Sequence, residues 1–143
     1  MADGPMPYGP PLSLESAKRA MAAAEAEAKK NDWPVVIFIL DSTGHAVMMQ
    51  RRDNTQYGSI RIAEGKARTA LEFRRSSKAF QDLIAKGERA LGFLSFDGIT
   101  AVQGGVPIVA GGKIVGAIGV SGVTSDQDEQ VALAGAQAVA GDC

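Results

Sequence analysis

Residues 104–122 decide the fold, and they read GGVPIVAGGKIVGAIGVSG. Two apolar runs, 106–110 and 113–120, stand on either side of Gly111-Gly112. A glycine pair adopts the positive φ angles of a two-residue type I′ or II′ turn at little steric cost. The stretch therefore predicts a β-hairpin.

Glycines also surround the second apolar run, at positions 116, 119 and 122. Because no side chain stands above the sheet at a glycine, another group can approach the backbone closely. A flat ligand can use this room. A tightly packed helix or partner subunit explains the same pattern, so the residues alone leave both interpretations open.

Upstream of the hairpin, the sequence predicts a helix followed by a strand pair. Ser13 is a suitable N-cap for an alanine-rich helix that ends near Asn31. Residues 34–40 are continuously apolar and rich in β-branched side chains, which is typical of a strand covered on both faces. A turn at 41–44 returns the chain as a second strand, 45–50. These two strands predict a second hairpin.

The remaining elements complete a layered domain. The spacing of apolar residues predicts a helix at 59–71, a short helix capped by Ser77, a short strand at 99–102 and a last helix that begins at Thr124 or Ser125. Strands joined as hairpins favour an antiparallel sheet, and continuously apolar strands need cover on both faces. The expected fold class is therefore α/β (α+β), arranged as three α/β/α layers.

Length and composition predict a single domain. The chain has 143 residues, of which 45% are hydrophobic, and this is enough to bury one core. We expect residues 1–11 to form a flexible tail and residues 12–143 to form the domain. The tail lacks a signal-peptide pattern and no apolar run is long enough for a bilayer, so we expect a cytoplasmic protein without a membrane partner. The single cysteine, Cys143, excludes an internal disulfide and a cysteine-based metal site.

Charge is distributed unevenly along the chain. The net charge is −1, but residues 51–90 carry ten Lys or Arg side chains against five Asp or Glu. This basic segment suggests an anionic partner, although a solvated helix face explains it equally well. The segment lacks interleaved aromatic residues, so the sequence predicts no nucleic-acid partner.

Several familiar site motifs are absent. Residues 105–113 lack the first glycine of a phosphate-binding loop, and the Ser or Thr that should follow is also absent. No G-x-G-x-x-G motif occurs in the sequence. Residues 119–123 resemble a nucleophile elbow without its closing glycine. With one histidine and no usable cysteine, neither a Ser-His triad nor a structural zinc site is expected.

A few polar residues remain as candidates for a site. His45 can ligate iron or carry a proton, although a lone histidine at the start of a strand is more often simply exposed or hydrogen-bonded. Arg51, Arg52 and Lys66 can hold carboxylates through charge-assisted bonds, or can serve solubility alone. Ser121 can donate to a ligand or cap a turn.

The chain resembles the GlcG/HbpS-like family, which includes the C-terminal domain of PduO-type proteins. The resemblance covers roughly residues 12–140. It is specific in GGVPI at 104–108 and in VGAIGVSG at 115–122, and it includes Gly44-His45, Arg51 with Asp53, KARTA at 66–70 and Asp128. It implies a profilin-like fold with a five-stranded antiparallel sheet and assembly into homo-oligomers. Some relatives bind haem or a corrinoid-related partner, and the segment 73–96 departs from the usual pattern.

Two functions from different classes follow from the residues and the resemblance. In the first, the protein binds haem or another anionic ligand over the glycine-rich strands. His45 is then the metal ligand, with Met48 and Met49 in reserve, and the ligand-binding residues are Arg51, Lys66, Gly104, Gly105 and Ser121.

In the second, the protein is a small enzyme without an organic cofactor. It acts on a hydroxy- or oxo-carboxylic metabolite, and His45 or Asp53 moves the proton. Arg51 or Lys66 holds the carboxylate, while backbone amides near residues 104–105 stabilise an oxyanion. This mechanism requires Arg51, Lys66, His45 and Asp53 to converge on one pocket. An oligomeric scaffold without ligand is a third alternative.

Overall fold

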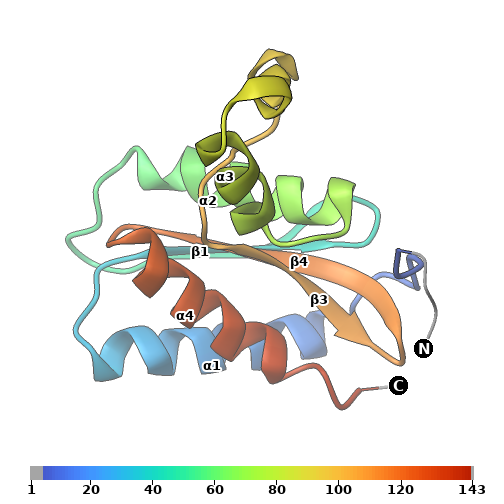
Figure 1. The fold of residues 1–143 in the computed structure, drawn as a ribbon. Helices are drawn as coiled ribbons and strands as arrows, with labels where there is room; N and C mark the ends of the chain where they lie inside the picture. The colour runs from blue at the N-terminus through green and yellow to red at the C-terminus, as the bar shows by residue number, and fades with distance from the viewer. Residues whose placement is uncertain (1–4, 143) are drawn as a thin grey trace.

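A four-stranded antiparallel sheet lies at the centre of the fold (Figure 1). The computed structural model describes residues 5–142. The strand order is β2-β1-β4-β3. The elements along the chain are α1 (Leu14–Lys30), β1 (Val36–Asp41), β2 (Ala46–Arg51), α2 (Ser59–Phe73), α3 (Ser77–Ala85), the 3₁₀ helix η1 (Glu88–Ser95), β3 (Gly105–Ala110), β4 (Lys113–Ser121) and α4 (Ser125–Gln137).

The three-layer α/β/α arrangement predicted from the sequence is present. Helices α1 and α4 cover one face of the sheet, and α2 covers the other (Figure 1). Alternate residues of β1 serve the two sides: Ile37 and Ile39 pack toward α1 and α4, whereas Phe38 packs toward α2. The strand is thus buried on both faces, as its continuous apolar sequence requires.

The glycine-rich hairpin forms as expected. Gly111 and Gly112 have φ angles of 60° and 74°, the positive pair of a type I′ turn, and they join β3 to β4. The Ser13 cap agrees with the prediction, because its side chain accepts a hydrogen bond at the start of α1. The predicted Ser77 cap was wrong: Ser76 is the N-cap of α3, and Ser77 is the first residue of the helix, with its hydroxyl donating to the carbonyl of Val102. At α4, Thr124 rather than Ser125 is the N-cap, and it forms a capping box with Gln127.

The sheet has four strands, so the expectation of five was wrong. The missing strand is the segment 99–102, which the sequence analysis placed in the sheet. Its backbone is bonded to helix side chains instead: the N–H of Thr100 donates to the hydroxyl of Thr69, and the hydroxyl of Ser77 donates to the carbonyl of Val102. Side chains of α2 and α3 therefore take the place of a neighbouring strand.

The N-terminal segment is held against the sheet from residue 7 onward. The N–H of Gly9 donates to the carbonyl of Ile114, and the N–H of Ile114 donates to the carbonyl of Pro7, both at 2.8 Å. The hydroxyl of Tyr8 also reaches the carbonyl of Leu71 at the end of α2. Residues 7–11, which belong to the segment expected to be a flexible tail, thus lie along β4 beyond the end of β1.

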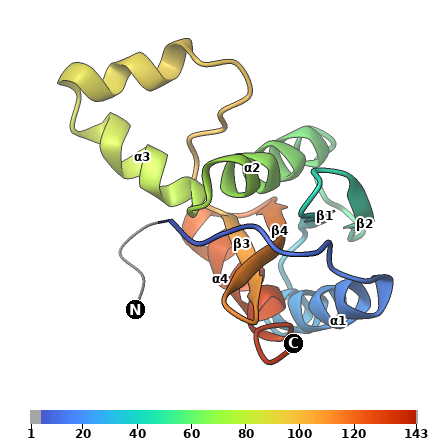
Figure 2. The same cartoon turned by 90° about the vertical axis from the view of Figure 1, so that its right-hand side faces the viewer.

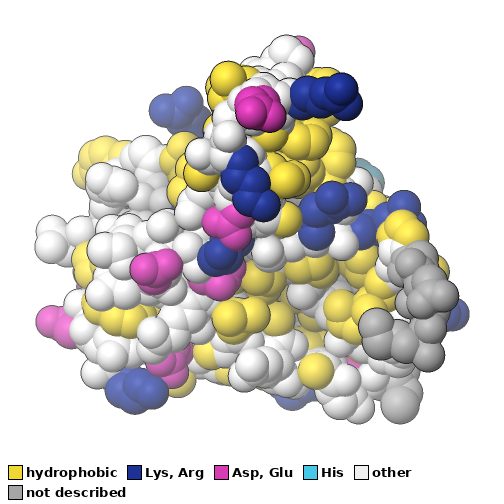
Figure 3. Space-filling view, in the orientation of Figure 1, with side chains coloured by type: hydrophobic (Ala, Val, Ile, Leu, Met, Phe, Trp, Pro, Cys, Tyr) yellow, Lys and Arg dark blue, Asp and Glu magenta, His cyan; other side chains and the backbone are white. Residues whose placement is uncertain are grey.

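Helices α3 and η1 project from the layered body (Figure 2). Edge-to-face contacts link Phe73, Phe80, Phe93 and Phe96 in a row, which gives this segment a small apolar interior. Large apolar side chains stay exposed on it, and Figure 3 shows hydrophobic surface beside Lys and Arg side chains in this region. Those exposed side chains are Leu91, Leu94, Phe96 and Val102.

Candidate functional site

Helix α2 fills the space above Gly119 of β4 and Gly105 of β3. A Cβ atom added to Gly119 would overlap the carbonyl oxygen of Ala63, and one added to Gly105 would overlap the carbonyl oxygen of Lys66. Close helix packing, one of the two interpretations of the glycine pattern, therefore accounts for these positions. The structure leaves no room there for a flat ligand between α2 and the strand.

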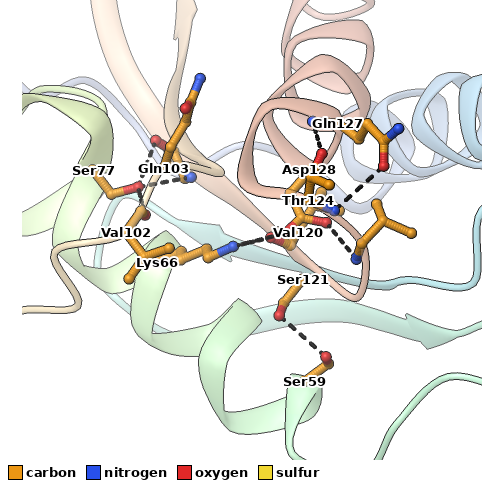
Figure 4. A network of polar contacts seen from close by, with 12 residues as sticks. Ser59, Lys66, Ser77, Val102, Gln103, Val120, Ser121, Thr124, Gln127 and Asp128 are labelled. Carbon is orange, nitrogen blue, oxygen red and sulfur yellow. Dashed lines mark hydrogen bonds and ion pairs between the residues drawn. The ribbon is translucent and has the colours of Figure 1, made fainter. Parts of the chain in front are cut away.

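Lys66 projects from α2 into the interior and pairs with a carboxylate (Figure 4). Its Nζ lies 3.0 Å from Oδ2 of Asp128 on α4 and donates to the carbonyl of Val120 at 2.9 Å. Both side chains are almost completely buried. The ion pair thus ties α2, β4 and α4 together around the end of β4.

Burial acts on both partners of this pair. It lowers the pKa of Lys66 and raises the pKa of Asp128, because removal from water penalises either charge. The attraction between the two charges and their hydrogen bond oppose both changes. The remaining carboxylate oxygen of Asp128 accepts from the N–H of Val123 at the start of α4.

The other predicted ligand residues of the glycine strands belong to the same interior network (Figure 4). The hydroxyl of Ser121 donates to that of Ser59 at 3.1 Å, and both residues are buried. The N–H of Gly105 donates to the hydroxyl of Ser77, and Gly104 lies directly beside the amino group of Lys66. Lys66, Gly104, Gly105 and Ser121 therefore come together, but inside the protein rather than around a cavity.

The sequence analysis missed the role of Asp128. A signal was present, because Lys66 shares its helix face with Ala63, Ala67 and Ala70, all fully buried. A lysine on such a face needs an opposite charge, and buried charges in proteins are paired. An acidic residue at the start of the last helix was the available partner.

His45 lies at the exposed turn between β1 and β2, in a chain of hydrogen bonds that begins at Asp41. Oδ1 of Asp41 accepts from the hydroxyl of Thr43 at 2.6 Å and from the backbone N–H groups of Thr43 and His45. The Thr43 hydroxyl lies 2.8 Å from Nδ1 of His45. Partial burial would raise the pKa of Asp41, but these hydrogen bonds outweigh it and lower the pKa below 3.8.

This chain of hydrogen bonds assigns the tautomer of His45. An ionised Asp41 only accepts, so the single proton of the Thr43 hydroxyl goes to Asp41. Nδ1 of His45 must then carry a proton and donate to Thr43, and in the neutral imidazole this leaves the lone pair on Nε2. Metal-binding histidines are commonly held in this way, with one ring nitrogen donating and the other free to ligate.

Arg68 is the cation next to the His45 turn. Its guanidinium donates to the carbonyl of Gly44 at 2.9 Å and pairs with Glu64 one turn earlier in α2. A cavity of about 370 Å³ opens at the same end of the sheet but on the side of α1 and α4; Leu12, Val139 and Lys113 are among its lining residues, and His45 and Arg68 are not. The sequence analysis proposed neither Arg68 nor Asp41 and Thr43 as site residues.

The loop after β2 carries two more predicted site residues. Arg51 and Asp53 line an open cavity of about 440 Å³ together with Asn54, Thr55, Gln56 and Tyr57. The guanidinium of Arg51 lies 5.2 Å from the centre of the Tyr57 ring. This is the one place where two of the predicted exposed site residues meet.

The four residues required by the acid–base mechanism do not converge. His45 and Arg51 stand at opposite ends of β2, about 20 Å apart at roughly 3.3 Å per extended residue. Asp53 lies with Arg51, and Lys66 is buried in its ion pair with Asp128. We therefore propose no proton-transfer mechanism built on these side chains.

Two further observations limit the kinds of site. Among residues 5–142, no three His, Cys, Asp or Glu side chains come together as a metal-ion site would require. Within the same range, none of the helices has the length and apolar character needed to traverse a bilayer.

Comparison with known proteins gives consistent relatives in sequence and in structure. Protein GlcG of Escherichia coli strain K12 is 40% identical over 110 residues, which cover 77% of this chain and 81% of GlcG. A crystal structure of a PduOC:heme complex matches with a TM-score of 0.83 at 25% identity, covering 90% of this chain and 95% of that one.

A crystal structure of HbpS matches with a TM-score of 0.82 at 31% identity and covers 96% of each chain. The model of the family described as "Haem degrading protein HbpS-like" matches residues 12–137, nearly the whole domain. The chain therefore belongs to the HbpS-like family.

Proposed function

We propose that this protein binds haem, with Nε2 of His45 as the axial ligand to iron. The observation that carries the proposal is the hydrogen-bond chain from Asp41 through Thr43 to Nδ1 of His45. It holds the imidazole in the tautomer that a metal requires and leaves Nε2 exposed. Family membership and the haem complex of the PduOC relative support the choice of haem as the metal group.

A cationic side chain beside the His45 turn suits the propionate groups of haem. Arg68 lies against the backbone of Gly44 and can pair with one propionate. The cavity lined by Leu12, Val139 and Lys113 lies on the other face of the sheet and does not include His45, so we do not assign it to the haem. The binding place thus moves from the glycine strands, where the sequence analysis put it, to the turn end of the sheet.

Titration with haemin tests the proposal directly. Wild-type protein should give a saturable shift of the Soret band, and His45→Ala should abolish it or change its position. Thr43→Val, which removes the hydroxyl, should weaken binding about two- to tenfold, while Thr43→Ser should retain it because the hydroxyl stays.

Two results would count against the assignment at different levels. A protein that shows no saturable shift does not bind haem. A shift that persists unchanged in His45→Ala means that another residue ligates iron, and Met49→Leu is then the next variant to measure. Met49 is 46% exposed, whereas Met48 packs against the core.

Assembly into homo-oligomers and a cytoplasmic location remain predictions from the resemblance and the sequence. The exposed apolar side chains of η1 and the following segment support the first, because such surface is often covered in an assembly. Native mass spectrometry, with and without haemin, measures the number of subunits and the bound mass together.

A further inference from the structure

The loop between β2 and α2 is a second candidate site, independent of His45. Thr55 anchors this loop. Its side chain is buried, and its hydroxyl donates to the carbonyl of Arg52 at 2.6 Å. The N–H of Arg52 in turn donates to the carbonyl of Val35, which anchors the loop to β1. The walls of the 440 Å³ cavity are therefore preformed.

Two adjacent arginines at this loop have different environments. Arg52 is half-buried, and its guanidinium donates to the carbonyl of Trp33 at 2.9 Å, so its place is structural. The side chain of Arg51 is exposed and makes neither a hydrogen bond nor an ion pair with any of residues 5–142. Its guanidinium contacts only the face of Tyr57, which leaves its N–H donors available.

Asp53 supplies the opposite charge in the same cavity. It is exposed, and within the described chain it too has no hydrogen-bonded or ionic partner. Arg51 and Asp53 are not paired with each other, although they are two residues apart and share one cavity. An anion alone would satisfy Arg51 and would be repelled by Asp53, whereas a molecule carrying both charges satisfies both.

Tyr57 forms part of the remaining wall of the cavity and suits a planar apolar group of the ligand. The ring of Tyr57 is 78% exposed beside Arg51, and stacking on such a ring is favourable for planar groups. Asn54 and Gln56 add amide groups, and the Nε2 of Gln56 is already committed to Ser59.

We propose that this cavity binds a small zwitterion of the amino-acid type, with its carboxylate on Arg51, its ammonium group on Asp53 and its flat side group on Tyr57. The site lies at the opposite end of β2 from His45, so the two ligands do not compete. In this proposal the protein binds haem at His45 and a small zwitterion at the loop between β2 and α2.

A matched set of three probes tests the charge requirement. Phenylalanine, 3-phenyllactate and 3-phenylpropionate share one skeleton and carry an ammonium group, a hydroxyl or a hydrogen at the same carbon. Binding is followed by calorimetry and by chemical-shift changes of the Asn54 and Gln56 side-chain amides. We expect phenylalanine to bind about tenfold more tightly than phenylpropionate, with phenyllactate between them.

Variants separate the cavity from general surface charge. Arg51→Gln and Asp53→Asn should each weaken phenylalanine binding about tenfold or more. Arg61→Gln is the matched control, because Arg61 is equally exposed and does not line the cavity. His45→Ala should leave phenylalanine binding unchanged, so failure of this site and failure of haem binding are distinguishable.

Three results would overturn the proposal. If none of the probes binds saturably, the cavity does not bind amino-acid-type zwitterions. Equal affinity for phenylalanine and phenylpropionate means that Asp53 does not select a zwitterion. Phenylalanine affinity that falls as much in Arg61→Gln as in Arg51→Gln means that only net charge matters.

Discussion

The Lys66–Asp128 network and the two ends of β2 use similar residues in opposite ways. In the network, lysine, serine and glycine are buried, and their polar groups are satisfied by one another. At the ends of β2, His45 and Arg51 are exposed and keep unused polar atoms directed to solvent. The comparison teaches that polar side chains hold the layers together where a helix covers them and face solvent where none does.

The largest effect is expected when one partner of the buried Lys66–Asp128 ion pair is removed. Lys66→Met should lower the free energy of unfolding by about 3–5 kcal/mol, because Asp128 is left as an unpaired buried charge. The double variant Lys66→Met/Asp128→Leu should regain most of that loss, since no charge is then buried alone. Denaturant unfolding measures each value.

The exposed pair Lys78–Asp82 provides the control for this experiment. Lys78→Met should cost less than about 1 kcal/mol, because water already screens that pair. If Lys66→Met is no more destabilising than Lys78→Met, the network does not hold the layers together.

A smaller effect is expected from filling the helix contact above β4. Gly119→Ala should cost about 1–3 kcal/mol in the free energy of unfolding, because α2 must move away to accommodate the added methyl group. Gly92→Ala is the control, since nothing lies within 4 Å of the position and the change there should be neutral or slightly stabilising. Equal values for the two variants would show that α2 does not pack on Gly119 as described.

The smallest effect concerns the His45 end and depends on pH. Since hydrogen bonds lower the pKa of Asp41 below 3.8, its ionised form contributes stability that is present above this value and is lost as the pH falls through the lowered pKa. Asp41→Asn should therefore cost about 1 kcal/mol at pH 7 and less at pH 3. Unfolding curves at both pH values measure the difference, and a cost independent of pH would exclude an ionised Asp41 as the acceptor.

Much of the architecture could be predicted from local sequence. The hairpin at Gly111-Gly112, the continuously apolar β1 and the Ser13 cap each depend on a few neighbouring residues, and each forms as expected. The fifth strand was wrong because residues 99–102 have strand-like composition, while side chains of two helices compete for their backbone groups. That competition cannot be predicted from the segment itself.

The candidate sites were less predictable than the fold. The importance of His45, Arg51 and Asp53 was inferred from residue type, but their separation along β2 follows from the length of the strand between them. Asp128 lies 62 residues from Lys66, and nothing in either neighbourhood indicates the other directly. A buried lysine is recognisable only when the helix face that carries it is known to be covered.

By itself, the sequence determined the turn chemistry, the strand that is buried on both faces and the inventory of one histidine and the charged side chains. Those features depend on backbone freedom and on hydrophobic pattern, which act over a few residues. Only the tertiary structure decided which polar groups are enclosed with partners and which face solvent. Burial and charge pairing arise from segments far apart in the chain, so they exist only once α2, β4 and α4 have packed together.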